Sequence, residues 1–114
     1  MYILQVKQHF DAAHYLNGYE GDCAKLHGHR WEVEIHLAYD KLDNLGMAVD
    51  FKSVKATLKE LLPDHKCLND IYTFNPTAEN LAKYLYEEIK VIYNYHLTRI
   101  KIWESPDCCI EYYE

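Results

Sequence analysis

The sequence lacks any long apolar run, and this absence limits where the protein can work. Although 49% of its 114 residues are hydrophobic, no stretch approaches the roughly 20 apolar residues needed to span a bilayer. The N-terminal residues also lack the basic leader and the apolar stretch of roughly 7 to 15 residues that mark a secretory signal. We therefore expect a cytoplasmic protein that does not insert into a membrane.

An excess of positive charge is also missing. The chain has 12 Lys and Arg against 18 Asp and Glu, a net charge of −6. Nucleic-acid binding depends on basic side chains that release counterions from the phosphates, so this balance argues against a nucleic-acid partner. A small anionic ligand is still compatible with the chain, because Lys25 and Arg30 form a local cationic pair. A solvated surface role explains these two residues equally well.

Signs of disulfides and of chain subdivision are scarce. Two of the four cysteines, Cys108 and Cys109, are adjacent, an arrangement that rarely lets both form disulfides without strain. Without an export signal, reduced thiols are expected. No internal repeat, low-complexity tract or linker-like stretch is present, so residues 1–114 are expected to form a single domain.

What is present is an alternation of apolar and polar residues at both ends of the chain. Residues 2–10 read as a strand, and residues 27–39 give the strongest strand pattern, with Trp31 and Val33 on its apolar face. Residues 15–26 read as a loop. A hairpin is expected near the C-terminus, with strands around 100–104 and 108–113 joined by a turn at 105–107.

Helical periodicity fills the middle of the chain. One face begins at Phe51 and Val54, and Pro63 stops this helix. A second helix starts near residues 75–77, where Asn75 or Thr77 can cap it and Pro76 is tolerated in the first turn. Its expected buried stripe consists of Ala78, Leu81, Ala82, Leu85, Ile89 and Ile92. The order ββααββ predicts an α+β fold, a four-stranded antiparallel sheet with both helices on one face.

Three histidines are the strongest chemical signal. His27 and His29 are two residues apart at the start of a strand, so both rings leave the same face and can reach one cation. His14 is the expected third ligand. Three imidazoles without a closing thiolate or carboxylate are typical of a catalytic zinc site with an open fourth position. The alternative is that these are ordinary hydrogen-bonded histidines.

Cys23 lies four residues before His27. A nearby cation favours the thiolate, so Cys23 is a candidate base or nucleophile. Alternatively, it closes the metal site as a fourth ligand or is an inert buried thiol.

Two carboxylates complete the candidate set. Asp64 can orient His65 and raise its basicity, which makes a proton relay; a solvated pair at a helix end is the alternative. Glu104 ends an apolar strand face, either as a solvated terminus or as an acceptor for paired N–H donors of a ligand.

The chain resembles the 6-pyruvoyltetrahydropterin synthase/6-carboxytetrahydropterin synthase family of the tunnelling fold. The motifs that carry this resemblance occur in family order from residue 10 to residue 104. They are Phe10-Asp11-Ala12-Ala13-His14, Cys23-Ala24-Lys25-Leu26-His27-Gly28-His29, Val49-Asp50-Phe51, Asp64-His65-Lys66-Cys67-Leu68-Asn69, Asn75-Pro76-Thr77-Ala78-Glu79 and Trp103-Glu104.

The resemblance implies a role for each candidate residue. It implies a zinc ion on His14, His27 and His29. It also implies proton transfer by Cys23 and by the Asp64-His65 pair, and a pterin ring anchored by Glu104. Lys66-Cys67 departs from relatives that often carry another histidine or an aromatic residue there, which leaves local substrate contacts open. The family builds its barrel from several subunits, typically a homo-hexamer of two trimers with the site at the subunit interface.

The three residues between Cys23 and His27 resemble the bacterial 6-carboxytetrahydropterin synthases of queuosine (7-deazaguanine) biosynthesis. The implied lyase reaction converts 7,8-dihydroneopterin triphosphate and water into 6-carboxy-5,6,7,8-tetrahydropterin, acetaldehyde and triphosphate. One alternative is 6-pyruvoyltetrahydropterin synthase, which eliminates triphosphate without breaking a carbon-carbon bond. Another is a non-catalytic metal- or pterin-binding module, and iron is an alternative to zinc.

Overall fold

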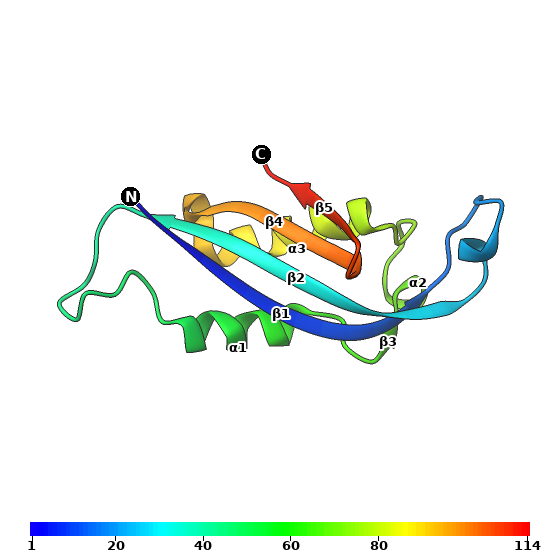
Figure 1. Cartoon of the computed structure of the whole chain (residues 1–114), viewed down its shortest axis with the longest axis horizontal. Helices are drawn as coiled ribbons and strands as arrows, with labels where there is room; N and C mark the ends of the chain where they lie inside the picture. Colours follow the sequence, from blue (N-terminus) through cyan, green and yellow to red (C-terminus); the bar gives the residue numbers. More distant parts are fainter.

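The computed structural model describes all 114 residues and is built on one twisted sheet (Figure 1). Four strands run antiparallel to their neighbours in the order β1-β2-β4-β5. They are β1 (Tyr2–His14), β2 (His27–Tyr39), β4 (Leu97–Ser105) and β5 (Cys108–Tyr112). The four predicted strands, their antiparallel pairing and the C-terminal hairpin are therefore confirmed, within a mixed sheet of five strands.

The sheet also has a short element that periodicity did not predict. β3 (Lys66–Cys67) adds a two-residue parallel strand beside Ala12 and Ala13 of β1. It is followed at once by the one-turn helix α2 (Leu68–Ile71). Two residues cannot show an alternation, and four cannot show a helical stripe. β1 itself runs to His14 rather than ending at residue 10, because its last residues pair with the start of β2.

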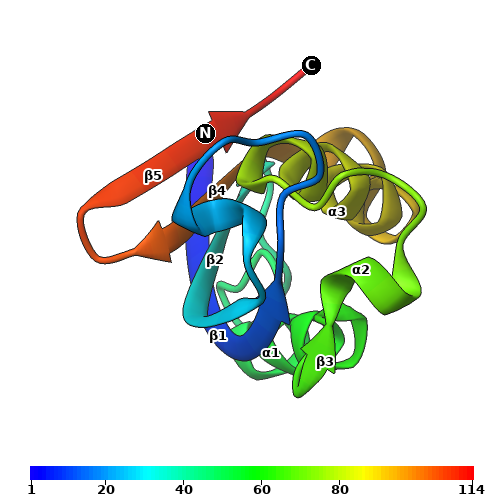
Figure 2. The ribbon, with the colours of Figure 1, turned by 90° about the vertical axis from the view of Figure 1, so that its right-hand side faces the viewer.

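Two long helices cover one face of the sheet (Figure 2). α1 (Phe51–Leu61) begins at Asp50, whose carboxylate accepts a hydrogen bond of 2.9 Å from Lys52 N. α3 (Ala78–Tyr93) begins at Thr77, whose hydroxyl accepts one of 3.1 Å from Asn80 N. Of the two predicted caps, Thr77 is the one used. The prediction that Pro76 lies in the first turn is wrong, because Pro76 precedes the cap.

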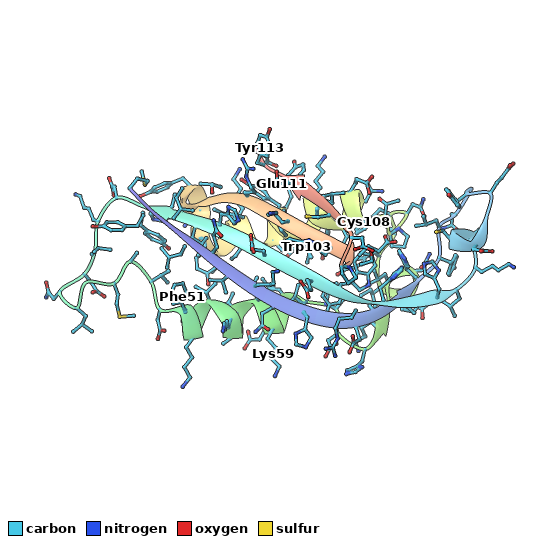
Figure 3. All side chains as sticks on the ribbon, viewed as in Figure 1. Phe51, Lys59, Trp103, Cys108, Glu111 and Tyr113 are labelled. Atoms are coloured by element: carbon cyan, nitrogen blue, oxygen red, sulfur yellow. The ribbon has the colours of Figure 1, made fainter.

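The core lies between the helices and this sheet face. It includes Val33 and Ile35 of β2, Ile100 and Ile102 of β4, and Leu58 of α1, each 0% exposed. On the other side of α1, Lys59 is exposed and points away from the sheet (Figure 3). The expected buried stripe of α3 is confirmed except at its last member, since Ile92 is 46% exposed. The next residue, Tyr93, packs against the core in its place.

The outer face of the sheet, which no helix covers, carries charged side chains. Lys7 lies 3.2 Å from Glu32, and Lys101 lies 3.8 Å from Glu111. The ammonium groups of Lys7 and Lys101 also lie 4.3 and 5.0 Å from the centre of the Trp103 ring. This alternation places polar residues opposite the apolar face. No helix of the structure combines the length and the apolar character needed to cross a membrane.

Candidate metal centre

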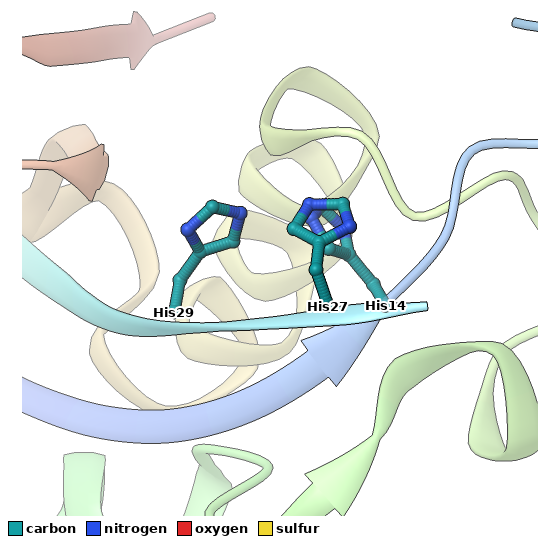
Figure 4. Close-up of side chains that lie close together, drawn as sticks. All are labelled: His14, His27 and His29. Atoms are coloured by element: carbon teal, nitrogen blue, oxygen red, sulfur yellow. The ribbon is translucent and has the colours of Figure 1, made fainter. Parts of the chain in front are cut away.

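The register of β1 against β2 brings the three histidines together. His14 is paired directly with His27, and His29 is paired with Ala12. Because residues two apart on a strand share a face, all three rings stand on the helix-covered face (Figure 4). One nitrogen from each ring lies within 4.8 Å of the others. The predicted arrangement of the three rings around one point is therefore present.

Backbone carbonyls fix which nitrogen of two of these rings is free. The Nδ1 atom of His14 lies 2.8 Å from Pro76 O, and that of His27 lies 2.6 Å from Lys25 O. A carbonyl oxygen only accepts hydrogen bonds, so both Nδ1 atoms carry the proton. Each Nε2 atom is thereby left with a lone pair for a metal.

Buried nitrogens without partners show that the residues fit a metal ion. The Nε2 atoms of His14 and His29 are buried and make no hydrogen bond, and only His29 Nε2 has a polar neighbour, the Glu104 carboxylate at 3.4 Å. This is a costly arrangement unless a ligand satisfies them. Burial lowers the pKa of both His14 and His29, which favours the neutral form that binds metals. No thiolate or carboxylate belongs to the group, so a fourth position is open.

Glu104 lies beside this group without joining it. Its Oε1 atom is 3.4 Å from His29 Nε2, at the end of the strand face that buries Ile100 and Ile102. A cavity of about 340 Å³ opens there, lined by His29 and Glu104 together with Trp103 and Ser105. A carboxylate at the wall of a cavity next to a metal group is placed to accept hydrogen bonds from a ligand.

Cys23 lies in the loop between β1 and β2, where the chain forms the short 3-10 helix η1 (Asp22–Ala24). It is a free, half-buried thiol, and its backbone oxygen accepts a hydrogen bond of 2.8 Å from Leu16 N. Cys23 is not one of the residues that converge on a shared point. The structure therefore keeps the thiol separate from the three-nitrogen group.

Asp64 and His65 form the predicted pair, with Asp64 Oδ2 3.5 Å from His65 Nε2. Their side chains are 49% and 80% exposed, unlike the fully buried His14. His65 has a φ of 56°, a left-handed conformation that costs a non-glycine residue free energy and is concentrated at functional sites.

Asp11 attaches this pair to the sheet, a role that sequence reasoning missed. Its backbone N–H donates to Asp64 Oδ1 at 2.9 Å, and its backbone oxygen accepts from His65 N at 2.7 Å. Its carboxylate accepts from Arg30 Nε at 3.1 Å, and this hydrogen bond lowers the pKa of Asp11. The only sequence signal was an acidic residue at an otherwise alternating strand position.

The Asp64-His65 pair lies at the edge of β1, where it is hydrogen-bonded to the backbone of Asp11 just before β3 pairs with Ala12 and Ala13. Asp11 and Arg30 alternate with the buried Ala12 and Trp31, so their side chains stand on the outer face. A cavity of about 600 Å³ at the ends of β1 and β2 is lined by His65, Lys66 and Cys67, and also by His29. The structure therefore brings together the three histidines and Glu104, but not the Asp64-His65 pair.

Comparisons with known proteins agree with this geometry. Residues 3–114 match the family model described as 6-pyruvoyl tetrahydropterin synthase. The chain is 34% identical to the 6-carboxy-5,6,7,8-tetrahydropterin synthase of Rickettsia felis, over 90% of this chain and 93% of that protein. It is 35% identical to the protein of the same name from a Synechocystis species, over 79% and 76%.

A solved structure shows the same fold over the whole chain. The 6-pyruvoyl tetrahydropterin synthase of Caenorhabditis elegans superposes with a TM-score of 0.81 at 26% identity, covering 100% of this chain and 97% of that one. The predicted four long strands and two long helices thus belong to this fold, and β3 and α2 lie between the two helices.

Proposed function

Because the chain belongs to the 6-pyruvoyl tetrahydropterin synthase family, we propose that it is a zinc-dependent 6-carboxytetrahydropterin synthase. This lyase converts 7,8-dihydroneopterin triphosphate and water into 6-carboxy-5,6,7,8-tetrahydropterin, acetaldehyde and triphosphate, a step of queuosine biosynthesis. The observation that carries the proposal is the buried Nε2 atom of His14, which has no partner, in one group with His27 and His29 beside Glu104.

The three histidines hold the metal in this proposal. Three neutral imidazoles with an open position are the ligand set of a catalytic zinc site. When bound, zinc supplies Lewis-acid polarisation of the oxygens on the substrate side chain. The bonds from His14 and His27 to backbone carbonyls keep each Nε2 aimed at the ion, and such partners also raise the basicity of the ligand.

Glu104 orients the pterin. Its carboxylate can accept two hydrogen bonds from adjacent N–H groups of the pterin ring. The distance of 3.4 Å to His29 Nε2 places the anchored ring beside the metal group. Trp103, the preceding residue, lines the same cavity. Orientation of this kind converts binding free energy into a productive approach of the reacting groups.

Cys23 and the Asp64-His65 pair transfer protons. Cys23, in its thiolate form, removes a proton from the substrate side chain, and His65 delivers one with Asp64 as its partner. Because the pair lies at the edge of β1, hydrogen-bonded to the backbone of Asp11, we assign it to the site of a neighbouring subunit. A homo-hexamer of two trimers, with its sites between subunits, accommodates this arrangement. The outer edges of β1 and β5 have no strand along most of their length, so they are available for pairing with another copy.

The carboxy-forming reaction is preferred over the pyruvoyl-forming one for two reasons. The relatives above with at least 34% identity are named for the carboxy product, and only three residues separate Cys23 from His27. One observation favours the second candidate, 6-pyruvoyltetrahydropterin synthase, since the solved structure with a TM-score of 0.81 has that name. Both reactions use the same substrate and the same proposed metal ligands.

Product analysis separates the two reactions. Purified protein loaded with zinc is incubated with 7,8-dihydroneopterin triphosphate, and acetaldehyde, triphosphate and the pterin product are measured. We expect acetaldehyde and 6-carboxytetrahydropterin in equal amounts, and no turnover after chelation. Triphosphate without acetaldehyde would support the pyruvoyl-forming alternative. Tight pterin binding without either product would support a non-catalytic module.

We place this activity in the cytoplasm. The proposed role of Cys23 needs a reduced thiol, and the cytosol keeps thiols reduced. All four cysteines of the structure are free.

A further inference from the structure

The loop that carries Cys23 is attached to the rest of the domain by two asparagine side chains. Asn69, in α2, accepts a hydrogen bond of 2.9 Å from Tyr15 N and donates one of 2.9 Å to Tyr15 O. Asn75, before α3, accepts one of 3.0 Å from Asn17 N and donates one of 3.3 Å to Asn17 O. Each amide thus holds both backbone groups of one loop residue, as a neighbouring strand would.

The residue between these two anchored positions is bonded to Cys23. Leu16 N donates to Cys23 O at 2.8 Å, so the two amides fix the donor that holds the Cys23 backbone. A loop of this kind has few other constraints, because it belongs to no strand. Side-chain amides that replace missing backbone partners can therefore determine where the loop lies.

The same segment also contacts the metal group. Asn75 holds Asn17, while the next residue, Pro76, accepts the hydrogen bond from His14 Nδ1 at 2.8 Å. The Asn75 backbone oxygen is itself held, by Thr77 N at 2.8 Å and Asn80 Nδ2 at 2.9 Å. One fixed turn thus sets both a metal-binding ring and the start of the Cys23 loop.

We propose that Asn69 and Asn75 are positioning residues that set the place of the Cys23 thiol relative to the three histidines. The inference rests on the proposed function only for the role of Cys23. The position of the loop can be tested without any turnover. Misplacement of a reacting group by about 1 Å can cost on the order of 100-fold in rate, so the loss of either amide should lower turnover while the metal stays bound.

Hydrogen exchange tests the positioning directly. In the full-length, zinc-loaded protein, Asn69→Ala should speed amide exchange at residues 15–24 about tenfold, since two hydrogen bonds are lost. Exchange in β2 and α3 should not change. The matched control is Asn44→Ala, an exposed turn residue between β2 and α1. The segment that joins β2 to α1 lies at the other end of the molecule from the loop between β1 and β2 (Figure 1), so this variant should leave the loop unaffected. Unchanged exchange at residues 15–24 in Asn69→Ala and Asn75→Ala would overturn the proposal.

Kinetics then test what the positioning does. Asn69→Ala should keep its zinc and lose about 10- to 100-fold in kcat. In a Cys23→Ala background the same substitution should leave the residual turnover unchanged, because the amide acts through Cys23. An equal loss in both backgrounds would show a merely structural role and contradict the proposal. If the unaltered protein is inactive, the proposed function fails, while the exchange experiment still decides the positioning.

Discussion

The metal group and the proposed proton-transfer residues are held in two different ways. His14, His27 and His29 stand on paired strand ends, and the register of β1 against β2 alone brings their rings together. Cys23 and the Asp64-His65 pair stand on loops, held by hydrogen bonds to Leu16 and Asp11. The sheet can therefore bring the three histidines together within one chain, while the groups proposed to move protons depend on loop anchors and, in our proposal, on a second copy.

The largest expected effect comes from removing one of the three histidines of the metal group. His29→Ala removes one of three ligands, so we expect zinc to be lost and turnover to fall by at least about 10³-fold. Metal analysis after gel filtration, combined with the turnover assay, checks both. The control is His9→Ala. His9 is an exposed residue of β1, the strand paired with β2, so this variant should keep zinc and activity. Stoichiometric zinc in His29→Ala would show that this ring is not a ligand.

The proposal that Cys23 and His65 of one site come from different subunits can be tested by mixing inactive chains. Cys23→Ala and His65→Ala should each lower turnover about 10²- to 10⁴-fold. If His65 serves a neighbouring subunit, refolding the two variants together restores some sites with both residues intact. Activity of the mixture should then rise well above that of either variant. No rise in a mixed oligomer would place His65 and Cys23 in the site of one chain.

Sequence reasoning succeeded where a repeated pattern carried the information. Alternation along residues 27–39 predicted the shared face of His27 and His29, and helical spacing predicted α1 and α3. It could not predict β3, the anchoring of Asp64 and His65 by Asp11, or the amide bonds from Asn69 to the loop. These contacts join residues more than 50 positions apart through single side chains or two-residue strands, and leave no period in the sequence.

A pH experiment distinguishes the buried histidines from exposed ones. Burial lowers the pKa of His14 and His29 in the folded chain, so the unfolded chain binds more protons below the ordinary value of about 6.5. The free energy of unfolding of the metal-free protein should therefore fall as the pH drops below about 6.5, and level off below the folded pKa values. Urea titrations at several pH values measure this slope.

The matched variants make the test specific. His29→Gln should reduce the slope, while His9→Gln should leave it nearly unchanged. If the unaltered protein and both variants had the same slope, burial of His14 and His29 would not govern how the free energy of unfolding depends on pH.

The smallest expected effect concerns Arg30. Its guanidinium is bonded to the carboxylate of Asp11, so it is engaged on the outer face rather than free for a triphosphate. We expect Arg30→Gln to keep zinc and to change kcat and KM by less than about tenfold, since exposed ion pairs contribute little. Steady-state kinetics with the triphosphate substrate checks this. A much larger rise in KM would assign Arg30 to the triphosphate instead.

The most direct test of whether Cys23 transfers protons or binds the metal is zinc content and turnover measured on the same preparation of Cys23→Ala. If Cys23 transfers protons and the three histidines alone hold the metal, this variant retains one zinc ion per chain and loses at least about 100-fold in turnover. Loss of zinc would make Cys23 a fourth ligand. Normal turnover would show that the thiol takes no part in the reaction.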